Sequence, residues 1–204
     1  MLTLYVTRHG ETEWNLQRRM QGWMDSALTP KGIRDAASLG ERLKDVELKA
    51  IYSSSSKRTL RTAELIRGDR EILIISDNDL REIHLGEWEG KVASEIEIED
   101  AEEYRAFWKT PHQYKPKSGE SFYEVHNRVK AALDKIIAEN TDGNVLIVTH
   151  AVVVKIIMSY FKGLSLETLW EPPFVHGTSL CVIEGVDGVP EIVLEGDISH
   201  LSEN

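Results

Sequence analysis

Apolar runs and amphipathic segments alternate along most of this chain. Continuous apolar runs rich in β-branched residues are typical of buried strands, and they occur at residues 2–7, 50–53, 72–75 and 144–148. Apolar residues at helical spacing predict helices at residues 30–44, 121–140 and 152–161, with a further helix after the serine run 53–56. This alternation predicts a three-layer α/β fold, in which helices cover both faces of a mainly parallel, mixed sheet.

Two segments depart from this alternation. Residues 13–25 show no clear period and are interpreted as a loop with at most one helical turn. Residues 91–119 combine acidic helical turns with a proline-containing loop, and this stretch is too short to bury a core of its own. We therefore expect a single domain spanning residues 1–204, with a small helical cap inserted at about residues 91–119.

The C-terminal part predicts a β-hairpin. Residues 178–184 and 191–195 have strand character and flank an Asp187-Gly188 pair, which is a common turn between antiparallel strands. The single cysteine, Cys181, lies in the apolar run of the first of these strands. Its position predicts a buried free thiol, and a lone cysteine is typical of a reducing compartment.

The charge balance limits the classes of partner. The formal net charge is −10 and no block rich in lysine and arginine occurs, so we expect neither nucleic acid nor an anionic membrane as partner. The first strand begins within two residues of Met1, and no apolar run approaches the ~18 residues of a membrane span. A cytoplasmic protein with a small-molecule partner is expected.

Two predicted strands end in similar polar residues. The first is followed by Arg8 and His9, and the strand at 144–148 is followed by His150. If these strands are adjacent, the three side chains meet at one sheet edge, and the helix that begins near Arg58 can point to the same edge. Arginine matches phosphate oxygens in a bidentate manner and histidine can donate or attack, so this set predicts a site for a phosphoryl group. A single strand-end histidine, in contrast, is more often a hydrogen-bonded structural residue.

Five separated segments resemble the histidine phosphatase superfamily, also called the phosphoglycerate mutase-like family. They are Arg8-His9-Gly10, Asn15 with Gln21-Gly22, residues 53–63 with Arg58, residues 80–90 with Leu80-Arg81-Glu82, and Val148-Thr149-His150. One departure is Ala151, which stands where the family commonly has glycine after the second histidine. Its methyl group would reshape the phosphate pocket slightly without removing a catalytic group.

The resemblance implies a role for each residue. His9 would attack phosphorus and carry a phosphohistidine, while Arg8, Arg58 and His150 would hold the phosphoryl oxygens without a metal. Glu82 would be the general acid that protonates the leaving oxygen and later the base that activates water. Around them, the implied substrate-binding residues also include Asn15, Gln21, Gly22 and Ala151.

No cofactor and no metal are expected. The remaining histidines show no spacing typical of metal ligands and are interpreted as surface or packing residues, although the loop at 172–177 could return His176 to the mouth of the site. The serine run at 53–56 is interpreted as helix capping rather than as a nucleophile.

Within the family, the chain most resembles the broad-specificity phosphatases of the PhoE branch. The acidic insert would repel substrates with repeated anionic groups, and Trp108, Phe122 and Tyr123 would favour bulky or apolar alcohols. The alternatives are a cofactor-dependent phosphoglycerate mutase and a narrow phosphatase acting on α-ribazole phosphate or fructose bisphosphate. A phosphate-binding protein without catalysis is a further alternative. The natural substrate and the oligomeric state are not predicted.

Overall fold

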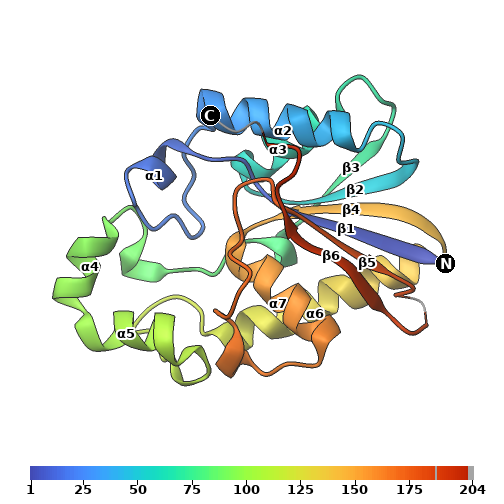
Figure 1. Ribbon diagram of the computed structural model, residues 1–204. Coiled ribbons are helices and arrows are strands. Elements are labelled where there is room, and N and C mark those ends of the chain that lie inside the picture. Colours follow the sequence, from blue (N-terminus) through green and yellow to red (C-terminus); the bar gives the residue numbers. More distant parts are fainter. Residues whose placement is uncertain (187, 202–204) are drawn as a thin grey trace.

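A computed structural model describes residues 1–186 and 188–201, and its centre is a single six-stranded sheet (Figure 1). The strands are β1 (Leu2–Arg8), β2 (Leu48–Ser54), β3 (Leu73–Asp77), β4 (Gly143–Thr149), β5 (Leu180–Glu184) and β6 (Glu191–Asp197). Their order across the sheet is β3-β2-β4-β1-β5-β6. The pairs β1/β4, β2/β4 and β2/β3 are parallel, and the pairs β1/β5 and β5/β6 are antiparallel. The predicted mixed, mainly parallel sheet is confirmed.

The C-terminal strands also follow the prediction. Strands β5 and β6 pair in antiparallel fashion, with Glu184 opposite Glu191. The predicted turn at Asp187 lies outside the described residues. Cys181 is buried in β5, and burial raises the pKa of its thiol to about 11.

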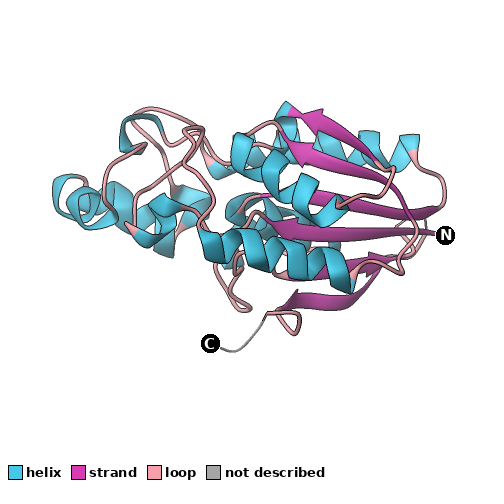
Figure 2. Ribbon diagram, turned by 90° about the horizontal axis from the view of Figure 1, so that it is seen from above, coloured by secondary structure: helices cyan, strands magenta, loops and turns pink. Residues whose placement is uncertain are grey.

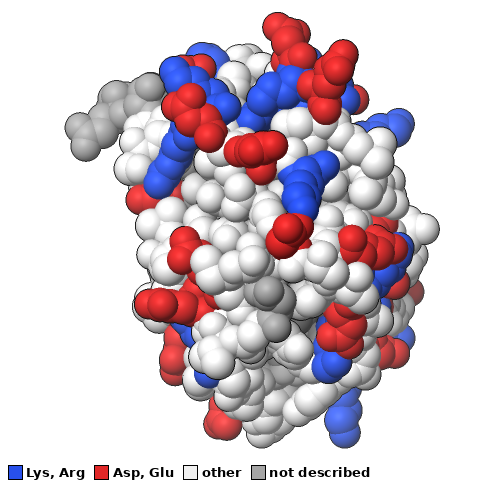
Figure 3. Space-filling model, turned by 90° about the vertical axis from the view of Figure 1, so that its right-hand side faces the viewer, with Lys and Arg blue, Asp and Glu red and all other residues white. Residues whose placement is uncertain are grey.

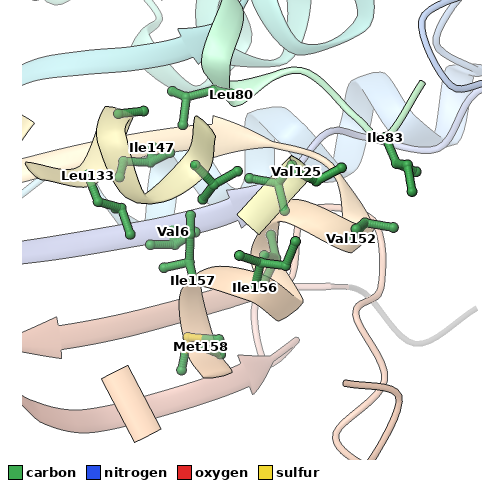
Figure 4. Close-up of a cluster of buried hydrophobic side chains, with 14 of the residues drawn as sticks. Val6, Leu80, Ile83, Val125, Leu133, Ile147, Val152, Ile156, Ile157 and Met158 are labelled. Carbon is green, nitrogen blue, oxygen red and sulfur yellow. The ribbon is translucent and has the colours of Figure 1, made fainter. Parts of the chain in front are cut away.

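Helices cover both faces of the sheet (Figures 1 and 2). Helices α2 (Pro30–Arg42) and α3 (Lys57–Arg67) lie on one face, and helices α6 (Phe122–Glu139) and α7 (Ala151–Lys162) lie on the other. On the second face, apolar side chains of α6 and α7 pack against those of β1 and β4, as for Val125, Ile157, Val6 and Ile147 (Figure 4). Burial of these apolar side chains drives the layers together.

The helices begin where local chemistry satisfies their first N–H groups. Thr29 accepts the N–H of Gly32 at 2.9 Å before α2, and Ser121 forms a capping box with Glu124 before α6. Before α3, Ser56 holds the N-cap position, but its hydroxyl makes no capping hydrogen bond. The carboxylate of Asp25 accepts the N–H groups of the first turn instead. The serine run therefore supplies the N-cap residue, as predicted, but Asp25 rather than a serine hydroxyl accepts the hydrogen bonds.

Helices α1 (Glu13–Leu16), α4 (Ala93–Glu99) and α5 (Ala101–Lys109) lie beyond the carboxyl ends of β1 and β4 (Figure 1). The described residues also form the 3-10 helices η1 (Asn78–Leu80), η2 (Gly86–Trp88), η3 (Pro111–Gln113) and η4 (Leu166–Thr168). Phe107 of α5 is buried and packs on Phe122 of α6 with ring centroids 4.9 Å apart. The cap thus shares the hydrophobic core of α6 and α7, and the boundaries of the predicted insertion remain a prediction.

The described residues contain no helix that is both long and apolar enough to cross a bilayer. Figure 3 shows the end of the molecule opposite the cap. On this face, basic and acidic side chains are interspersed, as expected when charge serves mainly to keep a surface hydrated.

Candidate active site

The adjacency of β1 and β4 brings the two strand-end histidines together. Arg8 is the register partner of Thr149, and the N–H of His9 donates to the carbonyl of Thr149 at 2.9 Å. The rings of His9 and His150 are therefore edge to face, with centroids 5.3 Å apart. Both side chains are buried. The convergence of these two histidines at one sheet edge, which the sequence predicted, is confirmed.

The turn after His9 holds the His9 ring in one tautomer. Nδ1 of His9 lies 2.7 Å from the carbonyl oxygen of Gly10, and a carbonyl oxygen can only accept, so the proton is on Nδ1. Gly10 is required here because a Cβ at this position would lie 2.6 Å from the carbonyl oxygen of Gly32. With Nδ1 engaged, Nε2 is the nitrogen that carries the free lone pair.

His9 is kept neutral. Burial lowers its pKa well below 6.5, and the positive charges of Arg58 and Arg8 lower the pKa further. Burial is the larger cause of this lowered pKa, and the two arginines are the smaller one. A neutral imidazole is the form that can act as a nucleophile.

Arg58 lies in the first turn of α3 and is almost fully buried. Its Nη1 donates to Asp25 Oδ1 and to the carbonyl of Met24, both at 2.7 Å. Its Nη2 donates to the carbonyl of Gly22 at 2.8 Å and to Nδ1 of His150 at 3.1 Å. Its Nε is buried and has no hydrogen-bond partner among the described residues. The guanidinium thus ties the loop before α2 to the second histidine and retains one free donor.

Both ring nitrogens of His150 are engaged. Because Arg58 donates to Nδ1, the proton is on Nε2, which donates to Oγ of Ser54 at 2.8 Å. Burial lowers the pKa of His150 well below 6.5, and Arg58 adds to this effect. Arg58 and His150 do not line the cavity described below, whereas Arg8 and His9 do. The contact of Arg58 and His150 with a phosphoryl group remains a prediction.

Arg8 extends from the end of β1 to the loop before β5. Its Nη1 donates to the carbonyl of Val175 at 2.9 Å, and its Nε is buried and has no partner in the described parts of the chain. Arg8 therefore presents an unsatisfied cationic donor at the wall of the cavity, which is the property that binds an anion.

Glu82 lines the same cavity and is held by two backbone N–H groups. Oε1 accepts from the N–H of Ile83 at 3.0 Å, and Oε2 accepts from the N–H of Val152 at 3.4 Å. Burial raises the pKa of Glu82 above 4.5, against the opposing effect of the Ile83 N–H and of the two arginines. This rise in pKa needs no bound phosphate, because burial already produces it.

The cavity has a volume of about 1030 Å³. Asn15, Gln21, Gly22 and Ala151 all line it, so the structure brings these predicted residues to the cavity of His9 and Glu82. Gln21 Nε2 donates to Oγ1 of Thr12 at 2.9 Å, and Oδ1 of Asn15 accepts from the same hydroxyl at 2.9 Å. These bonds orient both amides at the wall.

Aromatic side chains form the outer wall of the cavity. They are Tyr104, Phe107, Trp108, Trp170 and Phe174. Of the three aromatic residues predicted from the sequence, only Trp108 lines the cavity. Phe122 lies in the core beneath Phe107, and Tyr123 is exposed and lies outside the lining, because only one side of α6 faces the interior.

The charges of the cap are distributed differently from the prediction. Among its acidic residues only Glu97 lines the cavity, while Glu99 pairs with Lys91 at 2.9 Å and Asp100 pairs with Lys117. Besides Arg8, four cationic side chains line it, namely Arg19, Arg105, Lys109 and Lys155. The predicted repulsion of a second anionic group therefore loses its basis.

The loop at 172–177 does return to the cavity, but through other residues than His176. Pro172, Phe174 and Val175 line the cavity, and His176 is exposed and packs edge-on against Phe174 at 4.7 Å between centroids. Over the described residues, no three His, Cys, Asp or Glu side chains gather in a way that could hold a metal ion.

Two further residues of the site carried no signal in the sequence. Ser54 accepts from His150, and Asp25 pairs with Arg58, and both contacts join segments far apart in the chain. A serine at a strand end and an aspartate in a loop are common, so only the fold reveals these contacts.

Residues 4–198 match the model of the histidine phosphatase superfamily (branch 1). The chain therefore belongs to this family, in agreement with the resemblance seen in its motifs. The solved structure of Bacillus stearothermophilus YhfR is 51% identical, covers 99% of this chain and 100% of its own, and superposes with a TM-score of 0.96.

Curated relatives divide between two activities. Phosphoserine phosphatase 1 of Hydrogenobacter thermophilus is 32% identical over 170 residues, which are 83% of this chain and 81% of that protein. The probable phosphoglycerate mutase GpmB of Proteus mirabilis is 38% identical over 170 residues, which are 80% of this chain and 76% of that protein. The family thus includes relatives named as phosphatases and as mutases.

Proposed function

We propose that this protein is a phosphatase that hydrolyses phosphate monoesters through a phosphohistidine on His9. The observation that carries the proposal is the state of this ring: it lines the cavity, is held neutral, and donates from Nδ1 to Gly10. Its Nε2 lone pair is therefore available to an incoming phosphorus atom.

The proposed hydrolysis has two chemical steps, the formation and the hydrolysis of the phosphohistidine. In the first step, Nε2 of His9 attacks phosphorus, the bond from phosphorus to the alcohol oxygen breaks, and protonated Glu82 gives its proton to that oxygen. In the second step, the Glu82 carboxylate takes a proton from water, whose oxygen attacks phosphorus, and the bond from phosphorus to Nε2 breaks. Inorganic phosphate leaves, and Glu82 is protonated again. Burial raises the pKa of Glu82, which favours the protonated form that the first step requires.

The phosphoryl oxygens would be held by cations that already lie beside His9. Arg8 and Arg58 each have a buried Nε–H without a partner in the described part of the chain. Hydrogen bonds to charged groups contribute about 1.5–3 kcal/mol each, so two such donors can stabilise the transferring group substantially. His150 is the third proposed contact, and this contact requires its Nε2–H to exchange the Ser54 hydroxyl for a phosphoryl oxygen. The scheme uses neither a metal nor an organic cofactor.

Broad specificity toward the alcohol is proposed as well. The cavity of about 1030 Å³ and its aromatic wall support binding of bulky or apolar groups beyond the phosphate. The proposed partner is thus a small phosphate monoester. A cytoplasmic location is proposed from the single buried cysteine.

A second candidate is phosphoglycerate mutase. It is favoured by the Proteus mirabilis relative and by the cations Arg19, Arg105 and Lys109 along the cavity, which could receive a second anionic group. The phosphatase is preferred because the aromatic wall supports apolar alcohols, and the candidate narrow phosphatases differ from it only in the range of alcohols accepted.

Incubation with 4-nitrophenyl phosphate and a panel of metabolite phosphates, with and without a chelator, tests this proposal. We expect release of free phosphate from several substrates, at rates that the chelator leaves unchanged. Transfer of phosphate between the positions of phosphoglycerate, without net release, would select the mutase. No turnover of any phosphate ester would overturn both candidates.

The nucleophile is tested by trapping. Acid-labile, alkali-stable phosphate on the wild-type protein after rapid quenching should map to His9, and His9→Ala should carry none. Turnover of His9→Ala should fall by about 10³-fold or more, because the covalent route is removed. Labelled phosphate on another residue would overturn the assignment.

A further inference from the structure

Arg128 of α6 surrounds the backbone of the turn that carries Glu82. Its Nη1 donates to the carbonyls of Asp79 at 2.8 Å and Arg81 at 2.6 Å, and its Nη2 donates to the carbonyl of Glu82 at 2.9 Å. One guanidinium therefore binds the residue of the proposed general acid and the turn immediately before it.

Glu120 holds this guanidinium from the opposite side. Its Oε1 accepts from Nε of Arg128 at 2.8 Å, and its Oε2 accepts from Nη2 at 2.9 Å. The same Oε2 accepts the N–H of His84 at 2.8 Å, and the N–H of Glu120 donates to the carbonyl of His84 at 2.8 Å. The pair thus fixes the chain on both sides of Glu82.

This pair is largely withdrawn from solvent. The side chain of Arg128 is 15% exposed and that of Glu120 is 18% exposed. Two parallel N–H···O bonds between a guanidinium and a carboxylate set direction as well as distance, which a lysine cannot reproduce. The bidentate pair therefore fixes the position of the backbone at residues 79–84.

The carboxyl of Glu82 depends on this backbone. Its hydrogen bonds are to the N–H groups of Ile83 and Val152, and none of the described side chains bonds to it. A displacement of the turn would therefore move the carboxyl directly, without a side-chain partner to correct it.

We propose that Arg128 and Glu120 are positioning residues, which act through the backbone of residues 79–84 to hold the Glu82 carboxyl within reach of the leaving oxygen. This proposal rests on the proposed function of Glu82. Neither side chain lines the cavity, so neither is expected to touch the substrate.

The dependence on the leaving group distinguishes positioning from general stabilisation. A poor leaving group such as glycerol requires a proton from Glu82, whereas 4-nitrophenolate leaves without one. Loss of the Arg128–Glu120 pair should therefore slow the hydrolysis of an alkyl phosphate far more than that of an aryl phosphate. A protein that is merely less stable would lose both activities in the same proportion.

The experiment measures kcat and KM for glycerol 2-phosphate and 4-nitrophenyl phosphate. We expect Arg128→Met to lower kcat for the alkyl phosphate by about 10- to 100-fold more than for the aryl phosphate, because small displacements of a catalytic group have effects of this size. KM should change little for either substrate, and Arg128→Lys should restore part of the loss. Glu120→Gln, a milder change, should show the same preference and keeps the test valid if Arg128→Met does not fold.

Arg70→Met is the matched control. Arg70 also donates to three backbone carbonyls, those of Leu43, Ile66 and Arg67, but at the end of α3 remote from the cavity. We expect Arg70→Met to affect both substrates equally. A preferential loss of alkyl phosphatase activity in Arg70→Met would overturn the proposal.

A double-mutant cycle with Glu82→Gln completes the test. If Arg128 acts through Glu82, then Arg128→Met should cost nothing further once the acid is absent. A loss of the same factor in both backgrounds would overturn the positioning role. If Glu82→Gln alone shows no dependence on the leaving group, the proposed function of Glu82 fails instead, and the two failures are distinguishable.

Discussion

Asp25 Oδ1 accepts a hydrogen bond from Nη1 of Arg58 at 2.7 Å, although the two residues are 33 positions apart. The arginine side chain is 1% exposed and the aspartate side chain is 25% exposed. The same carboxylate accepts the N–H groups of Lys57 and Arg58 at the start of α3. One carboxylate thus neutralises the buried guanidinium and caps the helix that carries it.

Removal of this carboxylate should weaken the fold and the anion site together. We expect Asp25→Ala to lower the free energy of unfolding by about 1–3 kcal/mol, because buried donors lose their acceptor. KM for an aryl phosphate should rise, since Arg58 loses one of its anchors. Urea unfolding and steady-state kinetics measure both effects. Asp25→Asn, which retains an acceptor oxygen, should lose less on both measures, and equal losses would contradict this explanation.

The rate should fall at low pH because of the ionisation of His9, and at high pH because of the ionisation of Glu82. His9 must be neutral, and its pKa lies well below 6.5, so kcat/KM should fall only as pH drops through that lowered value. Glu82 must be protonated for poor leaving groups, and burial raises its pKa above 4.5, so the rate should fall as pH rises through the raised value. The profile with an alkyl phosphate should therefore be bell-shaped.

The Glu82→Gln variant tests which group causes the high-pH limb of this profile, in which the rate falls as pH rises. This limb should disappear in the variant, and the remaining rate for the alkyl phosphate should be lower by about 10²- to 10⁴-fold. Glu87→Gln is a suitable control, because Glu87 is exposed in the same segment and does not line the cavity. Persistence of the limb in Glu82→Gln would assign it to another group.

Much of the fold was predictable because its signals are local. Apolar runs and helical spacing indicated the main strands and helices, and strand-end polar residues indicated the edge where Arg8, His9 and His150 lie. The convergence required only that β1 and β4 be adjacent, which the sheet order confirms.

The contacts that complete the site are not local. Ser54, Asp25 and Arg128 acquire their partners through the path of the chain in space, and their residue types alone are common on any surface. The charge of the cap illustrates the same limit. The number of carboxylates in the cap can be read from the sequence, but the orientation of α4 and α5 decides which charges face the cavity. That orientation depends on how Phe107 packs on the core.

The close approach at Gly10 predicts a strong effect of one methyl group. In Gly10→Ala, the new Cβ would lie 2.6 Å from the carbonyl oxygen of Gly32, which is backbone and has little room to move. We expect a loss of about 1–3 kcal/mol in the free energy of unfolding, together with a loss of activity as the carbonyl that orients His9 shifts. Thermal unfolding and aryl phosphatase assays measure these effects.

Gly188→Ala provides the comparison for this steric argument. There the nearest atom to an added Cβ is the carbonyl oxygen of Gly185 at 3.9 Å, an ordinary contact. This variant should retain the stability and activity of the wild type. If Gly10→Ala behaves like it, the turn after β1 is more adaptable than its geometry indicates.

The cations of α5 predict how the protein treats charged alcohols. Arg105 and Lys109 are one helical turn apart and both line the cavity, together with Trp108. An aryl phosphate with a carboxylate on its ring would place that negative charge near Arg105 and Lys109. A neutral aryl phosphate of the same size would bring no charge to them. We expect Arg105→Glu to lower kcat/KM for the carboxylated substrate by about 3- to 10-fold relative to the neutral one, the size expected for partly exposed charges.

Added salt should reduce this difference, because partly exposed charges are screened. Lys115→Glu makes the same change of charge at an exposed residue after η3 that does not line the cavity, and it should leave the ratio of the two substrates unchanged. If both variants shift the ratio equally, the net charge of the protein rather than the cavity wall governs the response. If neither variant shifts it, the leaving group binds away from α5, along the wall formed by Trp170 and Phe174.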